Sequence, residues 1–147
     1  MPRKTHEIIV SEAGNAPVGI ATIKRAVSLV LGSEGTRDAR VSITFHSSQR
    51  MRALNRRTFG EDRATDVIAF PMRHDSLLVG DIYVCPAMAR RSASERGVPV
   101  REELLRLVVH GTLHLLGYVH SAGAGRTGSR MWRRQEKYLR CLMAGAR

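Results

Sequence analysis

The spacing of apolar and polar positions predicts alternating strands and helices in the first third of the chain. Residues 6–10 (HEIIV) are predicted to form a short strand. Apolar residues then recur at helical spacing, which predicts a helix over residues 18–31 that ends at Gly32. Residues 40–46 (RVSITFH) alternate between apolar and polar positions, as does a strand with one buried face.

The next segment is predicted to form a short helix followed by a loop. Ser47 or Ser48 can cap this helix, because a serine side chain accepts a hydrogen bond from a backbone N–H of the first turn. The helix is expected to end near Gly60. Charged residues without apolar periodicity follow over residues 60–64, which indicates a loop.

Two strands and a helix are predicted after this loop. Residues 67–70 form an apolar run that Pro71 is expected to stop, and residues 77–84 form the next strand. Pro86 suits the first turn of a helix, since proline lacks an N–H that this turn would leave unpaired. Gly97 is expected to end that helix.

Two longer helices are predicted in the C-terminal third. The first runs from about Pro99 to Leu116, and Gly117 suits the left-handed conformation that ends many helices. A glycine-rich connection over residues 121–128 leads to the last helix, over residues 129–144. The order of elements predicts an α+β fold in which helices pack on a mixed four-stranded sheet.

Composition adds a strong positive charge to this picture. The chain, residues 1–147, has the length of a single domain, and its hydrophobic fraction of 43% argues against intrinsic disorder. Its 24 Lys and Arg residues against 13 Asp and Glu residues give a formal net charge of +11. Such a charge favours polyanionic partners, although a basic, solvated surface is the alternative.

The sequence shows no export signal or membrane segment. Residues 1–7 are polar and charged, and no apolar run reaches the roughly 18 residues of a membrane span. Cys85 and Cys141 form no CxxC unit, so they are predicted to be free thiols in a reducing compartment. We therefore expect a cytoplasmic protein without a membrane partner.

The segment HGTLHLLGYVH, residues 110–120, carries the clearest chemical signal. His110 and His114 are four residues apart, so they lie on one face of a helix and both imidazoles can reach one metal ion. Gly117 ends the helix and lets the chain turn so that His120 approaches the same point. Three imidazoles leave a tetrahedral zinc ion one open position, which is typical of catalytic sites. The spacing thus predicts one zinc ion per chain in a zincin-like three-histidine site.

The same histidine spacing occurs in metzincin proteases. Their motif, HExxHxxGxxH, places a glutamate after the first histidine as the general base. Gly111 occupies that position here, so the motif lacks its proton acceptor. A metalloprotease is therefore the least favoured hydrolase.

Several motifs together resemble one known family. HGTLHLLGYVH is similar to the HGxLHLxGYDH signature of the YbeY family of bacterial endoribonucleases. Leu54 and Asn55, residues 65–71 (TDVIAFP) and residues 80–82 (GDI) resemble further blocks of that family. Met131 lies at the family's distance after the histidines.

The resemblance implies a single-strand-specific, zinc-dependent endoribonuclease that acts in 16S rRNA 3′-end maturation and in ribosome quality control. It implies that the zinc ligands are His110, His114 and His120. The implied partners are single-stranded RNA, the rRNA of the small ribosomal subunit, and the ribosome or its assembly factors.

Two positions depart from the family pattern. Val119 replaces the aspartate before the third histidine, and valine can neither orient a ligand nor handle a proton. Phe59 stands where the family has an arginine that is thought to be catalytically important. Arg56 lies one helical turn earlier and is the candidate for that catalytic role. The departures favour a second hypothesis, a non-catalytic ribosome-assembly factor that binds zinc and RNA.

Charge and the family resemblance suggest other candidates for RNA binding. Arg57 and Arg63 lie near Arg56, and the family motifs that contain Asp66 and Asp81 imply a role in the substrate groove; these four are the predicted substrate-binding residues. A turn-capping role is the alternative for the two aspartates. A basic cluster near the last helix is a further candidate, with a solvated surface as the alternative. Its members are Arg126, Arg130, Arg133, Arg134, Lys137 and Arg140.

Overall fold

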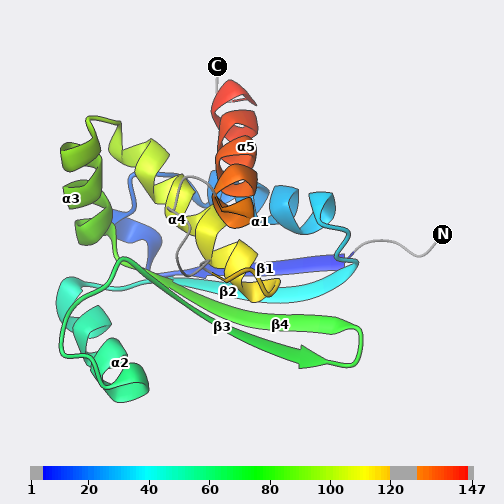
Figure 1. The fold of residues 1–147 in the computed structure, drawn as a ribbon, viewed down its shortest axis with the longest axis horizontal. Coiled ribbons are helices and arrows are strands. Elements are labelled where there is room, and N and C mark those ends of the chain that lie inside the picture. The colour runs from blue at the N-terminus through cyan, green and yellow to red at the C-terminus, as the bar shows by residue number, and fades with distance from the viewer. Residues whose placement is uncertain (1–4, 120–128, 146–147) are drawn as a thin grey trace.

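One mixed sheet forms the base of the structure, a computed structural model that describes residues 5–119 and 129–145. Its strand order is β1-β2-β4-β3. Strands β1, β2 and β4 run parallel, whereas β3 pairs antiparallel with β4. The strands are β1 (Thr5–Ser11), β2 (Asp38–Phe45), β3 (Val67–His74) and β4 (Leu77–Val84). The predicted α+β class and mixed four-stranded sheet are confirmed (Figure 1).

Most of the helices lie on one side of this sheet. Helices α1, α4 and α5 gather there with α3 beside α4, whereas α2 lies at one end of the sheet on the other side (Figure 1). None of the described helices is long and apolar enough to span a membrane. The described residues form η1 (Ala13–Asn15), α1 (Ile20–Ser33), α2 (Ser48–Phe59), α3 (Pro86–Arg96), α4 (Val100–Leu115) and α5 (Arg130–Gly145).

Helix α4 is the central helix of the core. It contacts α1, α3 and α5 and packs directly on β3 and β4. This close packing requires glycine, because a Cβ atom at Gly111 would lie 2.8 Å from Cγ2 of Ile82 and 3.2 Å from Cγ2 of Val67. Contact with the sheet therefore fixes the distance of α4 from the sheet and the rotation of α4 about its own axis. Helix α4 carries the histidines.

Neither Gly32 nor Pro71 ends its element as predicted. Helix α1 continues through Gly32 to Ser33, and the left-handed conformation that follows a helix occurs at Gly35, whose φ is 81°. Strand β3 continues through Pro71 to His74. Among the described strands β3 pairs only with β4, and this edge position tolerates a residue without an N–H.

Candidate active site

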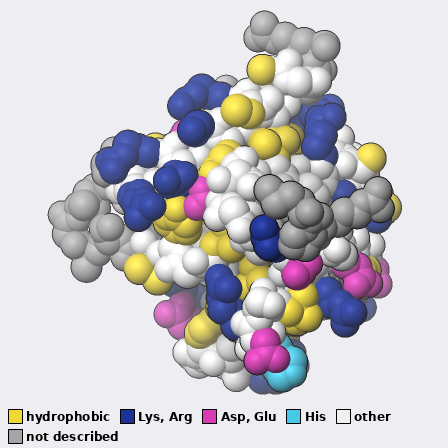
Figure 2. All heavy atoms as spheres, turned by 90° about the vertical axis from the view of Figure 1, so that its right-hand side faces the viewer, with side chains coloured by type: hydrophobic (Ala, Val, Ile, Leu, Met, Phe, Trp, Pro, Cys, Tyr) yellow, Lys and Arg dark blue, Asp and Glu magenta, His cyan; other side chains and the backbone are white. Residues whose placement is uncertain are grey.

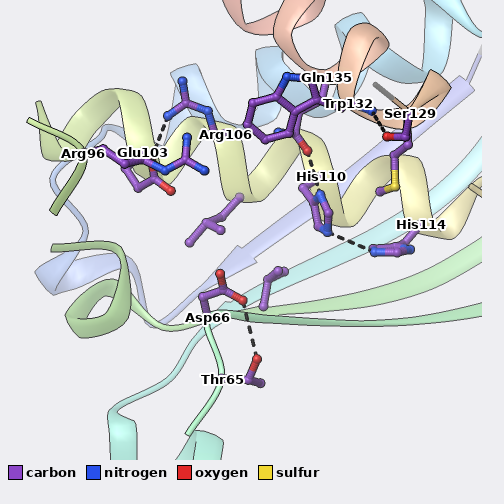
Figure 3. A pocket seen from close by; sticks show the side chains of 13 residues that line it. Thr65, Asp66, Arg96, Glu103, Arg106, His110, His114, Ser129, Trp132 and Gln135 are labelled. Atoms are coloured by element: carbon purple, nitrogen blue, oxygen red, sulfur yellow. Dashed lines mark hydrogen bonds and ion pairs between the residues drawn. The ribbon is translucent and has the colours of Figure 1, made fainter. Parts of the chain in front are cut away.

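Two histidine side chains one turn apart on α4 form the centre of the site. His110 and His114 are turned toward one another, and their Nε2 atoms lie 3.0 Å apart (Figure 3). Their rings are nearly perpendicular, with an interplanar angle of 84°. The helical spacing of the motif thus brings two imidazole nitrogens to one point.

The other ring nitrogens determine which tautomer each histidine adopts. Nδ1 of His110 lies 2.6 Å from Oε1 of Gln135, and Nδ1 of His114 lies 2.8 Å from the backbone oxygen of Tyr118. A carbonyl oxygen can only accept a hydrogen bond, so each Nδ1 donates. In a neutral imidazole the lone pair then sits on Nε2. Two lone pairs facing one another at 3.0 Å require a shared proton or a cation between them.

This arrangement fits zinc. Two nitrogens bound to a tetrahedral zinc ion at about 2.0–2.1 Å lie roughly 3.3 Å apart, so a small shift of either ring admits the ion. Metal-binding histidines characteristically donate their second N–H to a carbonyl or carboxylate, as both rings do here. Gly117, with a φ of 96°, ends α4 and redirects the chain. The third predicted ligand, His120, lies outside the described residues, within which no three His, Cys, Asp or Glu side chains converge.

A cavity of about 230 Å³ opens beside the two histidines. Helices α4 and α5 form two of its walls, and the segment before β3 forms a third (Figure 3). Asp66 extends from that segment toward α4, and the indole of Trp132 extends from α5 (Figure 3). The cavity therefore offers a carboxylate, an aromatic ring and the histidine pair to one ligand.

A buried ionic cluster supports the wall between α4 and α5. Arg106 donates to Glu103 at 2.6 Å and to both carboxylate oxygens of Glu136, at 3.0 and 3.1 Å. Burial alone would lower the pKa of Arg106, but the hydrogen bonds and charges of Glu136 and Glu103 raise it. Burial would raise the pKa of Glu136, but hydrogen bonds from Arg106 and Gln135 lower it. Arg106 and Glu136 are therefore both ionised at neutral pH.

Comparisons with known proteins identify the family. A family model described as "Endoribonuclease YbeY" matches residues 15–143. The chain belongs to the YbeY family. Endoribonuclease YbeY of Thermus thermophilus is 37% identical over 125 residues, which cover 82% of this chain and 88% of the relative. Endoribonuclease YbeY of Chlorobium phaeovibrioides is 35% identical over 125 residues, which cover 85% of this chain and 83% of the relative.

A solved structure shares this fold. The solution structure of a Thermotoga maritima protein matches with a TM-score of 0.68 and 30% identity, covering 94% of this chain and 90% of that one. The resemblance to the YbeY family inferred from the sequence motifs is confirmed. Membership supports an endoribonuclease role.

The two aspartates predicted to bind substrate lie on different faces of the sheet. Asp66 lines the cavity beside the histidines. Asp81 accepts a hydrogen bond from Oγ of Ser42 on the sheet face away from α4. The preceding residue, Gly80, faces Leu115 of α4, so the alternation of the strand directs Asp81 away from the cavity.

The arginines predicted to act in catalysis and binding lie on and after α2, and the cavity lining does not include them. Nη1 of Arg56 is 4.0 Å from the carboxylate of Asp62. Nη2 of Arg63 is 2.9 Å from the carboxylate of Glu61, and Arg57 is exposed. The roles of these arginines stay predictions.

Both positions that depart from the YbeY motif are exposed. Phe59 is 58% exposed and stacks on Phe70, with ring centroids 6.3 Å apart and nearly parallel planes. Val119 is 73% exposed. Neither side chain belongs to the buried core, so both can be exchanged for the family's residues without repacking it.

The basic cluster of the last helix divides into an exposed stripe and an inward-facing arginine. The exposed members of α5 recur at helical spacing, and Figure 2 shows basic side chains at several places over the upper part of the molecular surface. Arg134 instead donates to Glu34 at 2.8 Å. Arg126 lies outside the described residues. The exposed stripe consists of Arg130, Arg133, Lys137 and Arg140.

Several residues that support the site could not be predicted from sequence patterns. The spacing of Glu103 and Arg106 indicates an ion pair within one helix. No local pattern connects Gln135 with His110, because they are 25 residues apart on different helices. The backbone contact from Tyr118 depends on the turn after α4 and on no particular side chain.

Proposed function

We propose that this YbeY family member is a zinc-dependent endoribonuclease that cleaves single-stranded RNA. Its proposed tasks are 16S rRNA 3′-end maturation and ribosome quality control. The observation that carries the proposal is the pair of facing Nε2 atoms on His110 and His114, each imidazole held by a carbonyl oxygen at Nδ1. This geometry supports a cation between two histidines that line the cavity.

In this proposal one zinc ion is held by His110, His114 and His120. When bound, zinc supplies a Lewis acid that can polarise a phosphodiester or lower the pKa of a water molecule. Gln135 and Tyr118 keep the first two imidazoles in the orientation and tautomer that binding requires.

The charges around the site suggest how an RNA strand binds. The cavity is lined by two carboxylates, Asp66 and Glu103, and the two arginines of its lining, Arg96 and Arg106, both pair with Glu103. Phosphates are therefore expected at the cavity entrance and along the basic stripe of α5. The carboxylate of Asp66 can accept a hydrogen bond from a base or from a ribose hydroxyl. The proposed partners are rRNA of the small ribosomal subunit and the ribosome or its assembly factors.

A second candidate function is a non-catalytic zinc- and RNA-binding assembly factor. Phe59 favours it, because an exposed aromatic ring stands where the family has an arginine. Val119 favours it because it cannot handle a proton. A metalloprotease is disfavoured by packing as well as by sequence. Position 111 lies against Ile82 and has no room for the glutamate that such enzymes use.

Substrate comparison separates these functions. Pure protein with measured zinc content is incubated with a single-stranded rRNA fragment, with the same fragment in a duplex, and with a denatured protein. We expect cleavage of the single strand alone, its loss in His114→Ala, and its retention in His74→Ala, which changes an exposed histidine at the end of β3. RNA that is bound but not cut would favour the assembly factor, and cleavage of the protein substrate would favour a protease.

A further inference from the structure

Gln135 connects α5 to one of the predicted zinc ligands. Its side-chain oxygen lies 2.6 Å from Nδ1 of His110, and the residue is only 2% exposed. Gln135 thus meets His110 away from bulk water. The contact joins α5 to the helix that carries both described histidines of the motif.

The orientation of the Gln135 amide is fixed by its neighbour. Nε2 of Gln135 donates to Oε2 of Glu136 at 3.1 Å. The reversed amide would place its oxygen against this carboxylate and its NH2 group against Nδ1 of His110. The observed orientation is therefore the one in which His110 must donate from Nδ1.

The carboxylate of Glu136 is in turn held by a buried guanidinium. Arg106 contacts both of its oxygens, at 3.0 and 3.1 Å, and also donates to Glu103. Arg106 is 8% exposed, and its carbon stem rises from α4 one turn before His110. Arg106, Glu136, Gln135 and His110 thus form a chain of hydrogen bonds that begins and ends on α4.

We propose that Gln135 is the positioning residue for His110, and that Arg106 and Glu136 lock its amide in the required orientation. This inference rests on the proposed zinc site. By accepting from Nδ1, Gln135 leaves the lone pair of His110 on Nε2, where it faces His114. The alternative tautomer carries a proton on Nε2 and cannot bind a metal at that atom.

The chemistry at position 135 can be separated from its packing. Gln135→Met retains much of the shape but removes the acceptor for Nδ1. Gln135→Glu retains an acceptor for Nδ1 but adds a charge that Arg106 does not neutralise, because Arg106 already pairs with three carboxylates. A purely structural role predicts that both variants weaken the site, since both lose the donor to Glu136 and the second also adds a buried charge. A positioning role predicts that the two variants differ in zinc affinity.

Zinc affinity, measured by competition with a chromogenic chelator, is the test. We expect Gln135→Met to bind zinc about 10- to 100-fold more weakly. Gln135→Glu should bind as tightly as the unmodified chain or more tightly, because a carboxylate increases the basicity of the imidazole. Gln49→Met, at an exposed position on α2, is the matched control and should have no effect.

A spectroscopic measurement follows the same contact directly. In the zinc-loaded protein the Nδ1–H proton of His110 should give a downfield, exchange-protected NMR signal. This signal should persist in Gln135→Glu and be lost in Gln135→Met. If Gln135→Met does not fold, the same measurements are made on Glu136→Gln. That change removes the carboxylate that fixes the orientation of the Gln135 amide.

The outcomes separate this inference from the proposed function. Unchanged zinc affinity and an unchanged Nδ1–H signal in Gln135→Met would overturn the positioning role. Equal losses in the Met and Glu variants would overturn it in favour of packing. An unmodified chain that binds zinc but cuts no RNA would overturn the nuclease and leave the role of Gln135 intact, whereas one that binds no zinc would overturn both.

Discussion

Gly111 of α4 lies so close to Ile82 of β4 that an added Cβ atom would be 2.8 Å from the Ile82 side chain. The contact lies next to His110 in the sequence, so any shift of α4 away from the sheet also moves the site. We expect Gly111→Ala to destabilise the protein by about 1–3 kcal/mol through overpacking. Chemical denaturation measures this change.

Gly32 offers a matched control for that substitution. It is also helical, but a Cβ atom there meets nothing within 4 Å. Gly32→Ala should be neutral or stabilise the protein by up to about 1 kcal/mol, because alanine has the higher helix propensity. Equal changes in the free energy of unfolding at the two positions would show that close packing at Gly111 does not determine the effect of the substitution.

Acid stability should depend on Glu34, at the end of α1. Burial would raise the pKa of Glu34, but hydrogen bonds from Tyr118 and Tyr138 and the charge of Arg134 lower it below its ordinary value near 4.5. Because the folded state holds this pKa down, the stabilisation is complete above about pH 4.5 and is lost as the pH falls through the folded pKa. The chain should therefore lose stability in this acidic range.

Replacement of Glu34 tests this dependence. Glu34→Gln should lower the free energy of unfolding at pH 7 by about 1.5–3 kcal/mol, since a charged hydrogen-bond acceptor is lost. It should also flatten the decline of stability below pH 4.5. Urea denaturation at a series of pH values measures both effects. Glu61→Gln removes an exposed carboxylate paired with Arg63 and should change little, so equal losses would contradict the account.

The exposed stripe on α5 should contribute to RNA binding. Arg133→Gln with Lys137→Gln should weaken the binding of single-stranded RNA and leave zinc content unchanged. If each residue contacts one phosphate, the slope of log affinity against log salt should become less steep by about 1.4. Lys24→Gln with Arg25→Gln removes the same types of charge from the exposed face of α1. Identical slopes in both double variants would indicate that RNA binding depends on the net charge of the protein and not on the position of the stripe on α5.

The departures from the family motif should limit the cleavage rate. Phe59→Arg with Val119→Asp should raise the single-turnover rate, because a preorganised cation and a proton-handling carboxylate each contribute about 100-fold or more in other enzymes. Both side chains are exposed, so the fold should tolerate the change. Zinc content is held equal across the variants.

Arg56 provides the contrasting variant. If it already fills the missing role, Phe59→Arg alone should have little effect and Arg56→Ala should reduce the rate strongly. Arg52→Ala, on the same exposed helix, is the control, since Arg52 pairs with Asp62 as Arg56 does. No response to any of these substitutions would remove this surface of α2 from catalysis.

Local patterns predict the elements of this fold and the meeting of two histidines. Helical spacing is sufficient to place His110 beside His114, because both lie on one rigid helix. Pro71 and Gly32 do not end their elements, because whether a proline or glycine interrupts a strand or helix depends on where the residue lies in the fold. An edge strand tolerates Pro71, and Gly32 lies in the last turn of α1, where a glycine costs the helix only about 1 kcal/mol.

The contacts that orient the site arise from tertiary packing. Gln135 reaches His110 only because α5 packs on α4, and no periodicity specifies which residue will be opposite. The direction of Asp81, in contrast, follows from alternation alone. Leu78, Gly80 and Ile82 face the helices, so Asp81 between them faces away.

We propose that RNA cleavage by this chain depends on zinc held by the histidines of residues 110–120. The most direct test is single-turnover cleavage of a single-stranded rRNA fragment as metal-free protein is titrated with zinc. We predict a rate that rises with zinc occupancy and saturates at one ion per chain, with neither zinc binding nor cleavage restored in His114→Ala. Full cleavage by the metal-free protein, or undiminished zinc binding by His114→Ala, would contradict the account.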